Sequence, residues 1–288
     1  MTNLCFTTTG AWDLSTGFGC ASLGLPGVCD NSENTISTRE IPAKSVVLTG
    51  NYAEILAGAK DVAENEKVYA AIVVFGNAGG ENTFLADLYK IVSCPMVGGG
   101  AAIDGPTGRK GLIPGGSEGA VLLFTDDRFT YETQTQCIHN HVIKTCRLTL
   151  ADPRTILTID GEDAAQFLAN KKAELGLKAE DFEHLTLSDM NDVNAHLSCV
   201  DGVIKSGRDV CEQMKLRYVE HSDVYETMRA FYDDEEAIVF GCAGLSGLLD
   251  KALDTKSLGL FLFGEVCTVN GQPEFGNLML SKLKIRRK

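Results

Sequence analysis

Two short stretches of this 288-residue sequence carry residues that could do chemistry. The first is Gly241-Cys-Ala-Gly244, in which a cysteine lies at a predicted turn between a strand and a helix. A thiol beside a helix N-terminus has a lowered pKa, so Cys242 could serve as an acyl-transfer or hydrolytic nucleophile. No histidine lies near Cys242 in the sequence, and we therefore favour a packed or ligand-lining thiol.

The second stretch is Cys137-Ile-His139-Asn-His141. If it forms a strand, its first, third and fifth side chains point to one face, where they could bind a metal or where one histidine could ligate haem iron. No third, well-spaced ligand follows nearby. We therefore favour a polar strand face open to water, and we expect no tight metal or haem binding through His139 and His141.

The elements that would position Cys242 occur twice in the chain. Val74-Phe-Gly-x-Ala-Gly79 and Val239-Phe-Gly-x-Ala-Gly244 share one pattern, and each follows an apolar run of the length and composition of a buried strand. Helical spacing of apolar residues precedes and follows both runs. The predicted strands are 70–75, 119–124, 237–241, 258–263 and 275–284, and the predicted helices are 51–65, 81–92, one with Ser222 as N-cap, and 245–253.

This repetition predicts an α/β fold with mixed sheets, built from two duplicated α/β halves that face a central cleft. We place the N-terminal half at residues 1–150 and the C-terminal half at residues 151–288. Residues 1–45 are expected to form a strand or two with loops. Hairpins are expected at 128–150 and at 195–220, the second around Asp201-Gly202.

A buried strand that ends in a glycine turn and opens a helix presents backbone N–H groups at a helix N-terminus, which favours anions. Two such turns would line a ligand cleft between the halves, although the glycines could also serve tight chain reversal alone. We expect Glu265 to be the polar anchor, because it follows a glycine at the carboxyl end of a strand; it could instead cap a helix or face solvent. The candidate ligand-binding residues are Asn77, Gly98, Gly99, Gly100, Cys242, Gly264, Glu265 and Asn277.

Composition excludes several classes of function. The net charge of −13 would repel a phosphate backbone, which disfavours nucleic acid as a partner. No apolar run reaches the length of a membrane-spanning helix, and the N-terminus has no signal-peptide pattern, so we expect a cytoplasmic protein. The ten cysteines include no C-x-x-C pair, and the sequence has no P-loop, G-x-S-x-G or H-E-x-x-H motif.

Several segments resemble a known family in order and spacing. The segments 237–244, 260–266 and Phe275-Gly-Asn277 resemble the C-terminal part of the FIST domain, the "F-box and intracellular signal transduction" sensory domain. The stretch 71–105 resembles its N-terminal part, and 154–168 resembles the segment that links the two. The pair Gly264-Glu265 is the most distinctive mark of the resemblance.

The resemblance implies a cytoplasmic sensory module that binds a small ligand such as an amino acid or related metabolite, and relatives are fused to chemoreceptors, histidine kinases or cyclic-dinucleotide enzymes. Because we expect the two halves to occupy this chain, we expect a stand-alone module that signals through a separate protein, such as a kinase, cyclase or chemoreceptor. It implies neither a catalytic residue nor a required cofactor or metal. Two alternatives stay open at this point. One is a haem-binding gas sensor of the same family, and the other is an enzyme that depends on Cys242.

Overall fold

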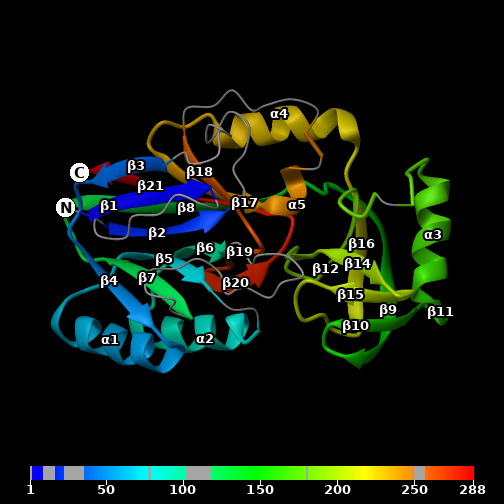
Figure 1. The fold of residues 1–288 in the computed structure, drawn as a ribbon, viewed down its shortest axis with the longest axis horizontal. Helices are drawn as coiled ribbons and strands as arrows, with labels where there is room; N and C mark the ends of the chain where they lie inside the picture. Colours follow the sequence, from blue (N-terminus) through cyan, green and yellow to red (C-terminus); the bar gives the residue numbers. More distant parts are fainter. Residues whose placement is uncertain are drawn as a thin grey trace.

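The structure is a computed structural model that describes residues 2–8, 17–22, 36–76, 79–101, 118–179, 181–246, 248–249 and 257–288. It confirms an α/β fold with mixed sheets. We call residues 141–218 the lobe, and the remaining described residues the body. The lobe lies to one side of the body (Figure 1).

A six-stranded sheet forms one layer of the body, in the order β20-β19-β6-β5-β7-β4. The central strand β5 (Ala70–Phe75) is parallel to β6 (Met96–Gly100) and antiparallel to β7 (Gly119–Phe124). The remaining strands are β4 (Ser45–Gly50), β19 (Glu265–Val269) and β20 (Gln272–Gly276).

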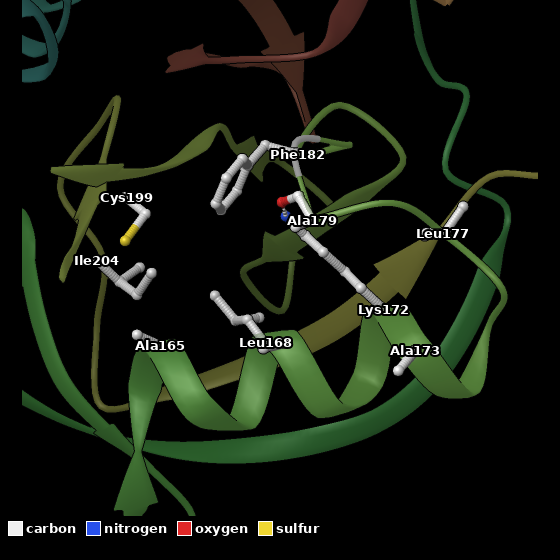
Figure 2. Close-up of a pocket in the computed structure, with 10 residues that line it drawn as sticks. Ala165, Leu168, Lys172, Ala173, Leu177, Ala179, Phe182, Cys199 and Ile204 are labelled. Carbon is white, nitrogen blue, oxygen red and sulfur yellow. Dashed lines mark hydrogen bonds between the residues drawn. The ribbon is translucent and has the colours of Figure 1, made fainter.

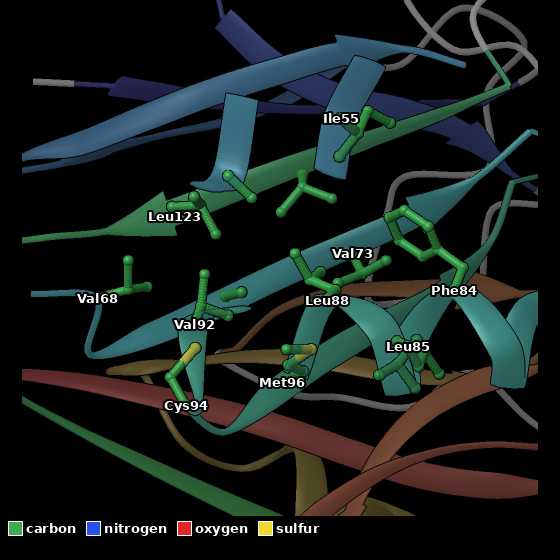
Figure 3. Close-up of a cluster of buried hydrophobic side chains, with 14 of the residues drawn as sticks. Ile55, Val68, Val73, Phe84, Leu85, Leu88, Val92, Cys94, Met96 and Leu123 are labelled. Carbon is green, nitrogen blue, oxygen red and sulfur yellow. The ribbon is translucent and has the colours of Figure 1, made fainter. Parts of the chain in front are cut away.

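Two amphipathic helices, α1 (Tyr52–Asn65) and α2 (Glu81–Val92), cover one face of this sheet (Figure 1). Their apolar side chains pack against alternate residues of the central strands, as Figure 3 shows for Ile55, Leu88 and Val73. Because β5 has a helix layer on one face and a second sheet on the other, every one of its residues is buried. This explains why the sequence of β5 is continuously apolar.

The second sheet of the body has four strands in the order β18-β17-β21-β8, and helix α4 (His221–Tyr232) covers its outer face (Figure 1). Its inner face packs on the six-stranded sheet through one apolar cluster that includes Ile72, Phe240 and Leu283. The body therefore has four layers, helix–sheet–sheet–helix. The elements are β8 (Phe129–Cys137), β17 (Ala237–Cys242), α5 (Ala243–Ser246), β18 (Leu258–Leu262) and β21 (Met279–Arg287).

The two sheets share one pattern of strand order and direction. In the order β6-β5-β7-β4, the first two strands are parallel to each other, and each of the next two neighbouring pairs is antiparallel. The order β18-β17-β21-β8 has the same sequence of directions. The motif-bearing strands 70–75 and 237–242 occupy the corresponding position in each set. This is the arrangement that a duplication would produce, and duplication itself remains our inference.

A three-stranded sheet near the N-terminus has the order β2-β1-β3 and lies beside β18 (Figure 1). Its strand β1 pairs parallel with β2 and antiparallel with β3. The strands are β1 (Thr2–Thr8), β2 (Gly17–Ser22) and β3 (Ile36–Ile41).

The lobe is an eight-stranded sheet with one helix, α3 (Ala164–Glu174), and it has an apolar core of its own. Seven strands follow the order β13-β12-β16-β9-β10-β15-β14, and β11 pairs with β10. Residue 150, our expected boundary between halves, lies inside β9. The strands are β9 (His141–Asp152), β10 (Thr155–Ile159), β11 (Glu162–Asp163), β12 (Leu185–Ser188), β13 (Asn194–Ala195), β14 (Leu197–Val200), β15 (Val203–Ser206) and β16 (Gln213–Tyr218).

Some local expectations were wrong. The expected hairpin at 128–150 does not form, because β8 pairs with β21 in the body whereas β9 pairs with β16 and β10 in the lobe. The N-cap of α4 is Glu220, and Ser222 lies in the first turn. The expected strand at 275–284 is divided between β20 and β21. The hairpin around Asp201-Gly202 is present as β14 and β15.

Helix α1 begins with a reciprocal capping box. The Asn51 side chain accepts from the Glu54 N–H at 2.9 Å, and the Glu54 carboxylate accepts from the Asn51 N–H at 2.9 Å. We expect Asn51→Ala to lower the free energy of unfolding by about 1 kcal/mol, since the backbone N–H of Glu54 loses its acceptor. Urea unfolding measures this. The control Asn65→Ala, at the other end of the helix, should stay within about 0.5 kcal/mol of wild type; equal losses for both variants would contradict the role of the cap.

Candidate ligand-binding site

A cavity of about 450 Å³ lies where the body meets the lobe. This size falls within the range of small-molecule pockets, ~300–1,000 Å³. Both parts of the molecule contribute to its wall. The body supplies Glu81, Cys242, Ala243, Gly244, Phe263, Gly264, Phe275 and Asn277, and the lobe supplies Arg154, Glu183, His196 and Gly207.

A carboxylate of the chain itself occupies the N-terminus of α2. Glu81 is 4% exposed; its Oε1 accepts from the Gly79 N–H at 2.8 Å, and its Oε2 accepts from Arg154 Nη2 at 3.0 Å. The Arg154 Nε also donates to Asp209 at 2.7 Å. The anion preference that we expected of this glycine turn is therefore met internally, by an ion pair that joins the body to the lobe.

Besides Glu81 and Arg154, the wall contains a second pair of ionisable side chains, Glu183 and His196. The Glu183 Oε1 lies 3.9 Å from the His196 Nε2, and the nearby His196 lowers the pKa of Glu183 below its usual value. The wall thus holds two acidic side chains, Glu81 and Glu183, together with the guanidinium of Arg154. A ligand that carries an ammonium group, a carboxylate or both finds partners here.

Asn277 joins the cavity wall to the lobe. Its backbone N–H donates to the Asn194 carbonyl at 2.9 Å, and its Oδ1 accepts from the His196 N–H at 3.3 Å. The adjacent Gly264 has φ +86°, and a Cβ there would lie 2.3 Å from the Phe275 ring and 2.9 Å from the Asn277 amide. Only glycine fits at position 264 without displacing two residues of the wall.

Cys242 contributes a neutral thiol to the wall. Burial, with a further contribution from the neighbouring Glu265, raises the pKa of Cys242 far above its usual value. The pKa of Glu265 is also raised well above its usual value, because the residue is fully buried. The Glu265 Oε2 accepts from the Met279 N–H at 3.2 Å, and Oε1 has no hydrogen-bond partner within the described part of the chain. At neutral pH both groups therefore keep their protons.

The structure places the predicted site residues in two shells. Cys242, Gly264 and Asn277 line the cavity, whereas Glu265 lies behind Cys242 and does not line it. Gly98, Gly99 and Gly100 lie behind the wall, where Gly100 exchanges hydrogen bonds of 2.9 and 3.0 Å with Phe263 and Gly264. Asn77 lies outside the described residues.

Four polar residues of the wall were missed as site residues from the sequence: Glu81, Arg154, Glu183 and His196. Glu81 had a usable signal, because it directly follows the Gly79-Gly80 turn and opens a helix. Arg154 is the first residue of the segment 154–168, and no pattern in the neighbouring residues indicates that it belongs to a binding site. Glu183 and His196 reach the cavity only because the lobe folds back against the body.

The histidine stretch does not form one strand. Cys137 ends β8 and His141 begins β9, so the expected common face for residues 137, 139 and 141 is wrong. His139 is fully buried; its Nε2 is 2.7 Å from the Glu183 carbonyl, and its Nδ1 is 3.2 Å from the Asn194 amide. Burial lowers the pKa of His139 to about 4, which keeps the ring neutral. Within the described residues, no group of three or more histidine, cysteine or acidic side chains could hold a metal ion.

Comparison with known proteins adds no assignment. No family model matches the chain, and no curated protein matches it. None of the helices in the described ranges is long and apolar enough to cross a membrane. The fold and the site define the class as an α/β protein with a mainly apolar cavity, edged by a few charged and polar side chains, between a four-layer body and a lobe built mostly of strands.

Proposed function

We propose that this protein is a sensory module that binds an amino acid or related metabolite in the cavity between body and lobe. The observation that carries the proposal is the wall of that cavity, which combines Arg154, two carboxylates and the amide of Asn277 with the aromatic rings of Phe263 and Phe275. The ligand's binding would be passed to a separate signalling protein in the cytoplasm.

The chemistry of the wall suits a zwitterion. A ligand carboxylate would accept from the Arg154 guanidinium, whose fork of N–H donors matches carboxylate geometry. A ligand ammonium would donate to Glu183 or Glu81, which are acceptors only. The rings of Phe263 and Phe275 would contact an apolar side chain. Glu265, as a buried neutral acid behind Cys242, would hold this wall in place rather than contact the ammonium directly.

The resemblance to the FIST domain supports a sensory role. The cavity residues Cys242, Gly264 and Asn277 all belong to the segments that resemble its C-terminal part, and Arg154 begins the segment that resembles its link. The contribution of both body and lobe to one cavity also suits a sensor, because a ligand there would bias their relative position.

The two alternative functions are less well supported. A nucleophilic cysteine needs a thiolate, and burial beside Glu265 favours the neutral thiol of Cys242. A haem ligand needs a free imidazole nitrogen, and both ring nitrogens of His139 lie at hydrogen-bonding distance from protein atoms. We therefore favour a module that binds a small ligand over both the enzyme and the haem-binding sensor.

The test is a thermal-shift screen of the amino acids and their decarboxylated amines, followed by calorimetric titration of the best hit. Arg154→Met should weaken binding of a carboxylate-bearing hit at least tenfold, or about 1.4 kcal/mol, since a charged hydrogen bond is lost. The control Arg147→Met, an exposed arginine of the same lobe, should leave the affinity unchanged. Absence of any hit, or equal affinity in both variants, would contradict this site.

Cys242→Ser separates the binding module from the enzyme. We expect the affinity for the same hit to stay within about tenfold of wild type, because serine preserves a small neutral group in the wall. Loss of a measurable turnover of the hit in Cys242→Ser would instead assign the protein to the enzyme class.

A further inference from the structure

The six-stranded sheet of the body ends differently at its two edges. At one edge, β20 contains a proline, Pro273, and the adjacent Glu274 accepts from the Asn191 amide of the lobe at 3.0 Å. At the other edge lies β4, on the side of the body away from the lobe (Figure 1). Within the described ranges, β4 pairs with β7 alone. The first edge is therefore protected by a proline and by the lobe, whereas the second is open.

The backbone of β4 directs hydrogen-bonding groups toward this open side. The Thr125 N–H donates to the Lys44 carbonyl at 3.1 Å, which sets the alternation of the ladder between β4 and β7. By that alternation Leu48, four residues after Lys44, also bonds to β7. The N–H and C=O groups of Val47 and Thr49 then point away from β7, where a further strand could pair with them.

The side chains of β4 do not protect the open edge. Edge strands usually carry a charge or a proline that prevents pairing with another chain, and residues 45–50 contain neither. Val47 is 40% exposed, and Leu48 is only partly buried. The α1 residue beside Leu48 is Gly58, where a Cβ would lie 3.0 Å from Leu48 Cδ2, so α1 adds no side chain at this point. An uncharged edge with exposed branched side chains is a template for strand pairing.

We propose that β4 pairs antiparallel with β4 of a second copy of this chain, about a two-fold axis that passes through Leu48. In this register Leu48 lies opposite Leu48 of the partner subunit, and Val47 lies opposite Thr49 of the partner subunit. The outward backbone groups of Val47 and Thr49 then pair with each other across the axis, and branched side chains meet branched side chains. A two-fold interface must be self-complementary in this way, which favours a second copy over an unrelated peptide.

The oligomeric state tests the proposal first. By size-exclusion chromatography with light scattering, we expect the wild-type protein to have twice the 30.9 kDa mass of one chain. Val47→Lys places a charge on the edge and should raise the dissociation constant of the dimer at least about tenfold. The control Val142→Lys changes a valine of the lobe that is 50% exposed, and it should leave the dissociation constant unchanged.

Cross-linking tests the register. Directly opposite residues on neighbouring strands have Cβ atoms ~4.5–5.5 Å apart, so Leu48→Cys should form a disulfide between subunits when the dimer is oxidised with copper phenanthroline. The control Val46→Cys lies on the same face, but its two copies would be four residues apart along the strands, about 13 Å, which is beyond disulfide reach. Both variants are made with serine at Cys211 and at Cys199, which lies in the lobe opposite α3 (Figure 2). The same background without a cysteine at 46 or 48 gives the baseline.

The proposal is overturned by any of three results with folded protein. These are a monomeric wild-type protein, a dimer that Val47→Lys and Val142→Lys affect equally, and equal cross-linking through residues 46 and 48. A monomer would leave the β4 edge to a strand of a different protein. If Val47→Lys fails to fold, the comparison of Leu48→Cys with Val46→Cys decides.

Discussion

Gly98→Ala should lower the free energy of unfolding by more than about 4 kcal/mol, or prevent folding altogether. A Cβ at position 98 would lie 1.9 Å from the Val73 carbonyl oxygen, inside van der Waals contact with the backbone of β5. Residue 98 also has φ +131°, which is unfavourable for an L side chain. Because β6 pairs with β5 on one side and β19 on the other, the backbone cannot move aside without breaking the sheet. Losses of this size are exceptional for one methyl group.

The matched control is Gly202→Ala. Its φ is +80°, and a Cβ there would meet nothing within 4 Å, so this variant isolates the cost of the backbone conformation, roughly 1–2 kcal/mol. Guanidinium unfolding of both variants gives the comparison. Equal losses would mean that close approach of β5 and β6 contributes nothing, and that Gly98 could then be free to contact a ligand.

Glu265→Gln should become increasingly more stable than wild type as the pH rises above about 5. Below its usual pKa, near 4.5, Glu265 holds a proton in both the folded and the unfolded state. At higher pH the unfolded state releases that proton, whereas burial makes the folded state keep it, so wild-type stability falls with pH until the raised pKa is reached. Glutamine has no proton to release. The advantage of the variant should therefore grow by up to about 1.4 kcal/mol for each pH unit.

The measurement is urea unfolding of both proteins between pH 4.5 and 8. At the low end we expect no advantage for glutamine, because its amide oxygen accepts from the Met279 N–H just as the protonated acid does. The slope of stability against pH is the quantity that tests the idea. The control Glu212→Gln replaces an exposed carboxyl of the lobe and should stay within about 0.5 kcal/mol of wild type throughout. Parallel pH curves for Glu265→Gln and wild type would show that Glu265 is ionised in the folded protein.

Elements with strong local signals were predicted well. The run 70–75 is apolar at every position because both faces of β5 are covered, and the helices that flank it showed regular apolar spacing. The expected glycine turn after 237–241 was wrong, because Gly241 and Cys242 lie within β17 and α5 begins directly at Ala243. Local signals failed where two partners compete, as for β8, whose neighbour in the sequence is β9 but whose partner in the sheet is β21.

The sequence by itself determined the buried strands, their helices, the order of strand followed by helix that occurs twice, and the choice of Cys242, Gly264 and Asn277 as candidate site residues. Each of these depends on a side-chain pattern within a few consecutive residues. The tertiary structure alone decided that β19 joins β6, which buries Glu265 behind Cys242, and that the lobe brings Arg154 to Glu81 and the His196 N–H to the side chain of Asn277. Such contacts join residues more than 70 positions apart, and the free energy that selects them comes from burial over whole sheets, which no short segment records.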